Sequence, residues 1–181
     1  MAGDRLVWID LEMTGLDPER CRIVEIATAV TDAELDLVAD GPSLVVHQPE
    51  PVLGACQPEA LELHRRSGLL ERVRAARLAE REAEAETLAF VRRHCEPRAS
   101  PLCGNSVWKD RQFLERYMPE LAAFLHYRTI DVSTIKELVR RWYPERFAAP
   151  PKRKTHRALD DIHESIAELR WYRRHVFVAP G

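Results

Sequence analysis

Apolar residues dominate three segments near the start of the chain, and each segment predicts a strand. Residues 6–9 form a short apolar run, and residues 22–32, RIVEIATAVTD, are rich in the β-branched side chains that favour strands. Residues 34–51 continue as a third extended segment, in which Gly41 and Pro42 predict a bulge or a bend. Three strands so close together in the sequence predict an antiparallel meander.

The pattern changes in residues 58–96, where Ala, Leu, Glu and Arg dominate and predict helices. Ser67 and Gly68 interrupt this region and predict a break between two helices. Apolar positions at helical spacing predict one buried helix face, made of Ala85, Leu88, Val91 and Cys95.

Short strands and helices alternate in the second half of the chain. Residues 100–106 predict a strand, residues 109–118 a helix, and Pro119 the start of a further short helix. Residues 128–134 predict another strand, and Ser133 or Thr134 can cap the helix that follows it.

A proline-rich loop and a closing helix complete the pattern. Residues 143–156 predict the loop, and the closing helix has an apolar stripe of Leu159, Ile162, Ile166 and Leu169. A meander followed by alternating helices and short strands predicts an α/β fold with a mixed sheet flanked by helices.

Length and charge narrow the classes of function. A chain of 181 residues, 45% of them hydrophobic, is long enough for one domain, which we expect to span residues 1–181. The 27 Lys and Arg residues nearly balance the 29 Asp and Glu residues, so the overall field offers no broad attraction for long nucleic acid. A polyanion that binds here must be short, gripped locally, or held through metal ions.

Cysteine usage and hydropathy predict a soluble cytoplasmic protein. The four cysteines form no C-x-x-C pair and have no histidine at zinc-finger spacing, which argues against structural zinc and against a disulfide framework. The first residues, MAGDRLVW, contain an acid and no apolar core, and no segment approaches the roughly 18 apolar residues of a membrane span. We therefore expect reduced thiols and no membrane.

Asp10 and Glu12 interrupt the first apolar strand. Residues i and i+2 of a strand point to the same face, so both carboxylates would lie side by side and repel each other unless a cation separates them. Taken alone, the pair is more typical of a strand that ends at Asp10, with Glu12 solvated in the turn toward Gly15.

Two further acids occur where ligands commonly gather. Asp110 follows GNSVWK at the predicted boundary of a strand and a helix. Asp161 begins the last helix at the border of its apolar stripe, whereas Asp160 is a solvated residue of the first turn. Four carboxylates can hold two Mg²⁺ or Mn²⁺ ions about 4 Å apart, a geometry that serves in-line phosphoryl displacement.

His156 is the candidate general base. It precedes Asp161 by five residues, which would place the two about 140° apart on a continuous helix. In a loop before the helix it could instead swing over the site and accept the proton of the attacking water. A surface histidine within the basic run at residues 152–157 fits the sequence equally well.

Four motifs together closely resemble the oligoribonuclease family, which belongs to the DEDDh group of 3′–5′ exonucleases. They are DLEMTGLDP, GNSxxxD, HYRxxDVSTIKEL and THRALDDIHES, and the resemblance covers residues 6–172. It implies an RNase H-like fold with a mixed five-stranded sheet and a homodimer. It also implies two-metal hydrolysis of very short RNAs, dinucleotides above all. By position the four acids are Asp10, Glu12, Asp110 and Asp161, and the histidine is His156.

The resemblance also implies substrate contacts. Tyr127 would reach an active site across the dimer interface, although a buried core tyrosine fits the bare sequence equally well. Leu16 would wedge against a base, where an ordinary turn-packing leucine is the alternative. The residues implied to contact the phosphates of the substrate are His64, Ser106, Arg128 and Ser133.

Two positions depart from the family pattern. Better-known members have Trp-Asn five residues before the position of His64, whereas this chain has Glu59 and Ala60, which removes a base-stacking ring. Trp108 stands two residues before Asp110, where a smaller residue is usual. We hypothesise that Trp108 supplies the stacking surface, the alternative being a tryptophan that packs beneath the site.

The expected reaction is release of nucleoside 5′-monophosphates from the 3′ end of short RNA. The four acids would hold two divalent cations, Mg²⁺ or Mn²⁺, and His156 would accept the proton of the attacking water. The alternatives are a DEDDh exonuclease for longer RNA or DNA ends and a non-catalytic RNA-binding protein on the same fold.

Overall fold

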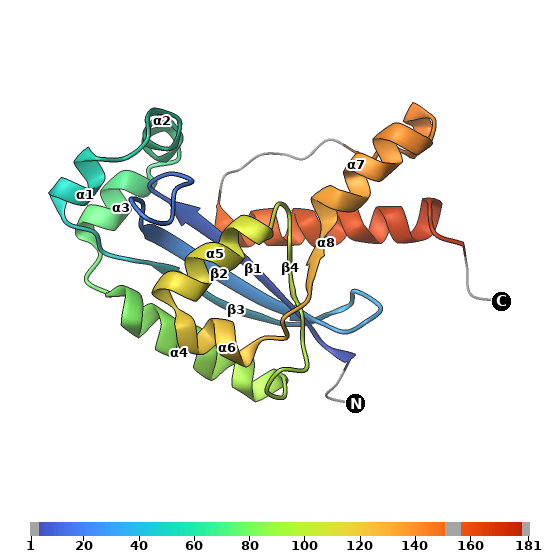
Figure 1. Ribbon diagram of the computed structural model, residues 1–181, viewed down its shortest axis with the longest axis horizontal. Helices are drawn as coiled ribbons and strands as arrows, with labels where there is room; N and C mark the ends of the chain where they lie inside the picture. The colour runs from blue at the N-terminus through green and yellow to red at the C-terminus, as the bar shows by residue number, and fades with distance from the viewer. Residues whose placement is uncertain (1–3, 151–156, 179–181) are drawn as a thin grey trace.

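A mixed five-stranded sheet forms the centre of the protein in a computed structural model, which describes residues 4–150 and 157–178 (Figure 1). The strand order is β3-β2-β1-β4-β5, with β2 antiparallel to both β1 and β3, and with β4 and β5 parallel to β1. The strands are β1 (Leu6–Met13), β2 (Ile23–Thr31), β3 (Leu37–Val45), β4 (Leu102–Gly104) and β5 (Thr129–Asp131). The predicted fold class and the predicted meander are confirmed.

The first strand extends past both acids. It pairs with β2 from Leu6 to Met13, and Glu12 lies directly opposite Glu25. The interpretation that this strand ends at Asp10 is therefore wrong, because backbone pairing with a fully buried β2 carries the strand further. The predicted bulge is confirmed, since two residues of β3, Gly41 and Pro42, oppose a single residue of β2.

Helices cover both faces of the sheet. Those with four turns or more are α4 and α8, and the full set is α1 (Glu50–Gly54), α2 (Pro58–Arg66), α3 (Leu69–Ala75), α4 (Glu80–His94), α5 (Trp108–Tyr117), α6 (Pro119–Phe124), α7 (Val132–Trp142) and α8 (Ala158–His175). A short 3₁₀ helix, Glu145–Phe147, follows α7. The predicted break at Ser67 and Gly68 separates α2 from α3.

Alternation along β1 divides the core into two halves. Val7, Ile9 and Leu11 pack with α4, α5 and α6 on one face of the sheet. Trp8 packs on the other face with Ala158 and Ile162 of α8. Because side chains alternate along a strand, Asp10 and Glu12 share the face of Trp8 and point toward the side covered by α8.

Two local predictions are wrong. The N-cap of α7 is Asp131, whose carboxylate accepts the N–H of Ser133, so the helix begins before either predicted cap residue. Ala85 is exposed, because the buried face of α4 runs through Ala83, Thr87 and Val91 instead. The polar Thr87 is completely buried in that face, which a search for apolar positions misses.

Two expectations concern the state of the cysteines and the presence of membrane-spanning helices. Cys21, Cys56, Cys95 and Cys103 are all free. Across residues 4–150 and 157–178, each helix is too short or too polar to cross a bilayer.

Candidate active site

Three carboxylates meet at the end of β1. Asp10 and Glu12 come from that strand and Asp161 from the first turn of α8, and one oxygen of each lies within 4.8 Å of the others. Burial, followed by the negative charges of Asp161, Glu25 and Asp110, raises the pKa of Glu12 to about 8. The three acids thus lie together, and their role as metal ligands stays a prediction.

Asp110 approaches the same place from α5. Strand β4 pairs with β1 only at Val7 and Trp8, and the N–H of Leu11 further along donates to Oδ1 of Asp110 at 3.0 Å. Asp110 is 7% exposed, and burial raises the pKa of its carboxyl to about 7. It lies outside the 4.8 Å trio but near enough for its charge to act on Glu12.

The donor set fits a hard divalent cation. All three members of the trio are carboxylates, the ligand type that Mg²⁺ and Mn²⁺ prefer. A bound cation would offset the burial and the repulsion that raise the pKa of Glu12, since an opposite charge favours the ionised form. The cluster of half-buried acids therefore fits a metal site.

His64 lies beside Glu12. It is 3% exposed, its Nε2 lies 2.8 Å from the carbonyl oxygen of Met13, and its Nδ1 lies 3.8 Å from Oε2 of Glu12. Burial lowers the pKa of His64, and a carbonyl only accepts, so the neutral ring carries its proton on Nε2. The side chain thus adjoins the acidic trio, and its predicted contact with a phosphate stays a prediction.

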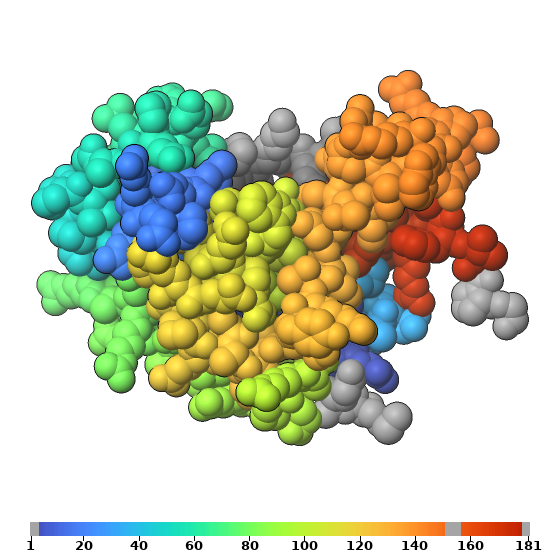
Figure 2. Space-filling model, in the orientation of Figure 1, coloured from blue at the N-terminus to red at the C-terminus, as the bar shows by residue number. Residues whose placement is uncertain are grey.

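The loop between β1 and β2 presents Leu16 to solvent. This loop is the blue segment in Figure 2, at the surface between the helices α1–α2 and α5. Leu16 is 63% exposed, so it does not pack within the turn. Its N–H donates to Oε1 of Gln57 at 3.0 Å, and the N–H of Gln57 donates to the Thr14 carbonyl at 2.8 Å.

Gln57 is a residue that the sequence analysis missed. Its carboxamide fills the space in which a Cβ on Gly15 would stand, since that Cβ would lie 2.4 Å from Cδ of Gln57. The hydrogen bond from Leu16 to Gln57 joins residues 41 positions apart, and nothing in the local sequence of either marks it.

Two predicted phosphate contacts lie together beside β5. The N–H of Ser106 donates to Oδ1 of Asp131 and to Oγ of Ser133, each at 2.9 Å, and the two serine hydroxyls are 3.3 Å apart. Ser106 has a φ of 50°, which an L residue rarely adopts and which these bonds hold in place. Asp131 was not among the sequence candidates, although Asp before a helix is a common cap.

The aromatic candidates are exposed. Tyr127 is 74% exposed and Trp108 is 56% exposed, so a core tyrosine and a tryptophan packed beneath the site are both wrong. The Arg128 guanidinium lies 5.5 Å from the Tyr127 ring centroid, and Nζ of Lys109 lies 4.4 Å from that of Trp108. His156 lies outside the described residues.

The sequence of this chain is similar to those of known exonucleases. A family model for exonucleases matches residues 7–169. An oligoribonuclease of Marinobacter nauticus is 54% identical over 175 residues, which cover 97% of each protein. An oligoribonuclease of Alkalilimnicola ehrlichii is 57% identical over 176 residues, which cover 97% of this chain and 91% of that protein.

Solved structures share the fold at low sequence identity. Exonuclease I of Methylocaldum szegediense superimposes on 95% of this chain with a TM-score of 0.73 at 21% identity. Exonuclease I of E. coli, in complex with a dA16 oligonucleotide, does so on 96% with a TM-score of 0.74 at 16% identity. The chain spans 41% of the length of both structures, and at these identities the likeness concerns the fold.

The raised pKa values of Glu12 and Asp110 predict how metal-free protein responds to pH. A folded carboxyl with a raised pKa binds its proton more tightly than the unfolded chain does, so stability falls as pH rises from about 5 to 8. We expect the Tm in EDTA to drop by several degrees across this window, since about 1 kcal/mol shifts Tm by about 2–4 °C at this size. Mg²⁺ should restore the loss at pH 8.

Two variants isolate this effect in thermal unfolding. Glu12→Gln should flatten the pH profile, whereas Glu62→Gln, at an exposed position of α2, should leave the slope as in the wild type. A metal-free protein that gains stability between pH 5 and 8 would contradict the assignment of a proton to the acidic site.

Proposed function

The chain belongs to the oligoribonuclease family of exonucleases, and we propose that it removes nucleotides from the 3′ end of very short RNAs, dinucleotides above all. The observation that carries this proposal is the meeting of Asp10, Glu12 and Asp161 in a chain that matches oligoribonucleases over nearly its full length. The expected product is a nucleoside 5′-monophosphate.

We propose that the site holds two divalent cations, Mg²⁺ or Mn²⁺. Bound ions would supply the positive charge that lowers the pKa of an attacking water and stabilises the leaving 3′ oxygen. Asp10, Glu12 and Asp161 are the candidate ligands, and Asp110 would join them with a carboxylate already oriented by the Leu11 N–H. His156 is proposed to accept the proton of the water.

The substrate contacts are proposed around this centre. The Ser106 hydroxyl, 3.3 Å from that of Ser133, could donate to a phosphate, Ser133 would adjoin the phosphate while it donates to Asn105, and Arg128 could add charge. Leu16 is proposed to wedge against a base and His64 to contact a phosphate from the Glu12 side, a contact for which Nδ1 of His64 has to take up a proton. The near balance of charges supports a short substrate, because long nucleic acid would require an extended basic surface.

We also propose one exonuclease domain over residues 1–181 and a cytoplasmic location. The family match at residues 7–169 supports the first, and four free thiols support the second.

The proposed activity is tested by a substrate-length series of RNAs from two to about ten nucleotides, with Mg²⁺ present. We expect kcat/KM to be highest for the dinucleotide and to fall steeply with length. A flat profile would favour an exonuclease for longer RNA or DNA ends. Binding of short RNA without any hydrolysis would favour the non-catalytic alternative.

Neighbouring aspartates provide a matched control for the site. Asp161→Asn should lower kcat by at least about 100-fold, since even partners outside the metal's own ligand shell commonly cost 10–100-fold. Asp160→Asn, at an exposed position one residue earlier, should leave kcat unchanged. His156→Ala should lower kcat by about 10²–10⁴-fold, the usual contribution of a general base. Near-normal turnover in Asp161→Asn or His156→Ala would contradict the assigned roles.

A homodimer is proposed, with Tyr127 reaching the site of the partner. Its high exposure supports this role, because a ring that is 74% exposed is available to a second subunit. We expect the purified chain to sediment at twice its 20.9 kDa mass, and Tyr127→Ala to raise the KM for the dinucleotide. A monomer with full activity would contradict both statements.

Trp108 is proposed to stack on a base in place of the ring that is missing at residue 59. Stacking is worth about 1–3 kcal/mol per base, so Trp108→Ala should raise the dinucleotide KM by about 5- to 150-fold with a smaller effect on kcat. Trp142→Ala removes a tryptophan of α7 that is even more exposed, at 70%, and should leave KM unchanged. An unchanged KM in Trp108→Ala would exclude the stacking role.

A further inference from the structure

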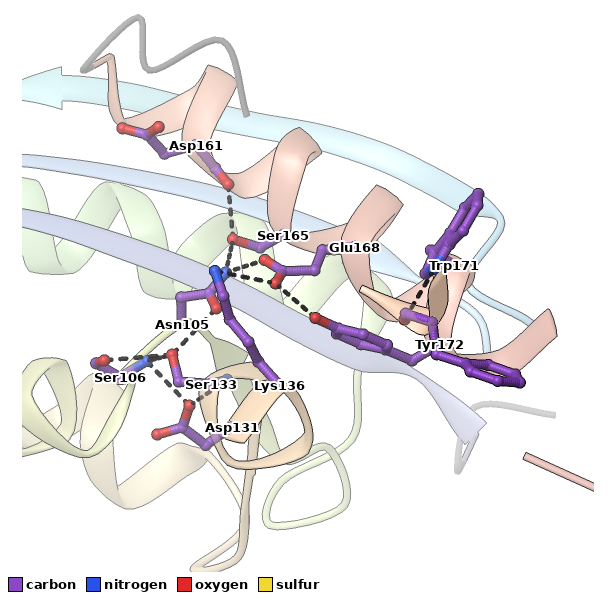
Figure 3. A network of polar contacts seen from close by, with 11 residues as sticks. Asn105, Ser106, Asp131, Ser133, Lys136, Asp161, Ser165, Glu168, Trp171 and Tyr172 are labelled. Atoms are coloured by element: carbon purple, nitrogen blue, oxygen red, sulfur yellow. Dashed lines mark hydrogen bonds and ion pairs between the residues drawn. The ribbon is translucent and has the colours of Figure 1, made fainter. Parts of the chain in front are cut away.

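Asn105, at the end of β4, connects three separate elements through its side chain (Figure 3). Its Nδ2 donates to Oγ of Ser165 at 2.6 Å and lies 3.5 Å from Oε2 of Glu168. Its Oδ1 accepts the hydroxyl of Ser133 at 3.1 Å. Because the carboxylate of Glu168 only accepts hydrogen bonds, the amide nitrogen of Asn105 is the end that faces α8. Asn105 therefore donates toward α8 and accepts from α7.

One branch of this network ends at the turn that carries Asp161. The Ser165 hydroxyl, 5% exposed, accepts from Asn105 and donates to the main-chain oxygen of Asp161 at 2.7 Å. Asp10 and Glu12 lie on β1, the parallel neighbour of β4. The chain of bonds thus runs from the sheet that holds two of the acids to the helix turn that holds the third.

The other branch ends at the proposed phosphate contacts. The Ser133 hydroxyl that donates to Asn105 also accepts the N–H of Ser106, whose φ of 50° depends on this bond and on Asp131. Displacement of the Asn105 side chain would therefore free the Ser133 hydroxyl to rotate and weaken its bond to the Ser106 N–H, which Asp131 would still accept.

Directional bonds restrict the rotation and translation of α8 along the sheet further than non-directional apolar contacts do. The helix also packs on the sheet through Ala158, Ile162 and Ile166, and Nε2 of His163 lies 3.0 Å from Oδ1 of Asp40 on β3. Metal ligands must be held to within about 0.5 Å. Oε1 of Glu168 accepts the hydroxyl of Tyr172 at 3.2 Å and lies 3.5 Å from Nζ of Lys136, which leaves Oε2 facing Asn105.

We propose that Asn105 is a positioning residue with two separable effects. Through Ser165 it sets Asp161 against Asp10 and Glu12 for the divalent cation, and through Ser133 it sets Ser106 for the phosphate of the substrate. This inference rests on the proposed function for its second effect, whereas the first concerns cation binding alone.

Variants that cut one branch or both test the proposal. Ser165→Ala cuts the α8 branch and should weaken Mn²⁺ binding, measured by calorimetry without substrate, on the order of 10-fold or more, leaving KM at saturating Mn²⁺ unchanged. Asn105→Ala cuts both branches and should weaken Mn²⁺ binding and raise KM. Asn105→Asp keeps the acceptor for Ser133 but places a carboxylate against Ser165 and Glu168, so it should lose Mn²⁺ affinity and keep KM.

Two controls separate positioning from general stability. Ile166→Val loosens the packing of the same helix beside Ser165 and should lower Tm without changing Mn²⁺ affinity. Gln112→Ala removes an exposed carboxamide from α5 and should change neither.

Wild-type Mn²⁺ affinity in Ser165→Ala and Asn105→Ala would overturn the proposal, as would an equal loss of affinity in Ile166→Val. Because Mn²⁺ binding is measured without RNA, these outcomes do not depend on whether the proposed hydrolysis occurs. Loss of Mn²⁺ affinity in the variants, together with a wild type that leaves dinucleotides intact, would contradict the proposed function and support the positioning role.

Discussion

The burial of neighbouring carboxylates at the end of β1, together with their mutual repulsion, is the constraint on which the rest of this structure depends. Three acids lie with oxygens within 4.8 Å of one another, and a fourth, Asp110, is almost completely buried next to them. Without a cation, the folded chain keeps protons on this group, as the raised pKa values of Glu12 and Asp110 indicate. The fold must supply enough stability elsewhere to hold the acids together.

The two halves of the core meet this requirement from opposite faces of the sheet. One face of β1 is anchored by Val7, Ile9 and Leu11, so its other face can carry the acids. α8 brings Asp161 to that face and is held by apolar packing on Trp8 and by the bonds of Ser165 and Asn105. Strand β4 pairs with β1 only at Val7 and Trp8, so the N–H of Leu11 is available to donate to Asp110. This bond connects α5 to the end of β1.

Much of this arrangement could be predicted from the sequence, because it depends on local patterns. The β-branched runs predicted the meander, Gly41 and Pro42 predicted the bulge, and the spacing of Asp10 and Glu12 placed both acids on one face. The approach of Asp161 to Asp10 and Glu12 was inferred from the family motifs rather than from spacing. These residues are about 150 positions apart, whereas a hydrophobic pattern relates residues only within one helix or strand.

Long-range contacts were missed, and two local predictions failed. Gln57 bonds to Leu16 across 41 residues and Asn105 bonds to Ser165 across 60, and neither contact leaves a periodic pattern in the sequence. The apolar pattern of α4 predicted Ala85 on the buried face, whereas Ala85 is exposed and the polar Thr87 is fully buried. Asp131 was overlooked as the cap of α7 because the strand before it ends at that same residue.

The most direct measurement of the central claim is the number of protons released when Mn²⁺ binds at pH 7. It is obtained by titration calorimetry in two buffers with different ionisation enthalpies. If protons stand in for the cation in the metal-free site, binding must release them, and the apparent enthalpy will differ between the buffers in proportion to the protons released. The same binding enthalpy in both buffers would mean that the acids are already ionised, and would contradict the claim that protons replace the cation in the metal-free protein.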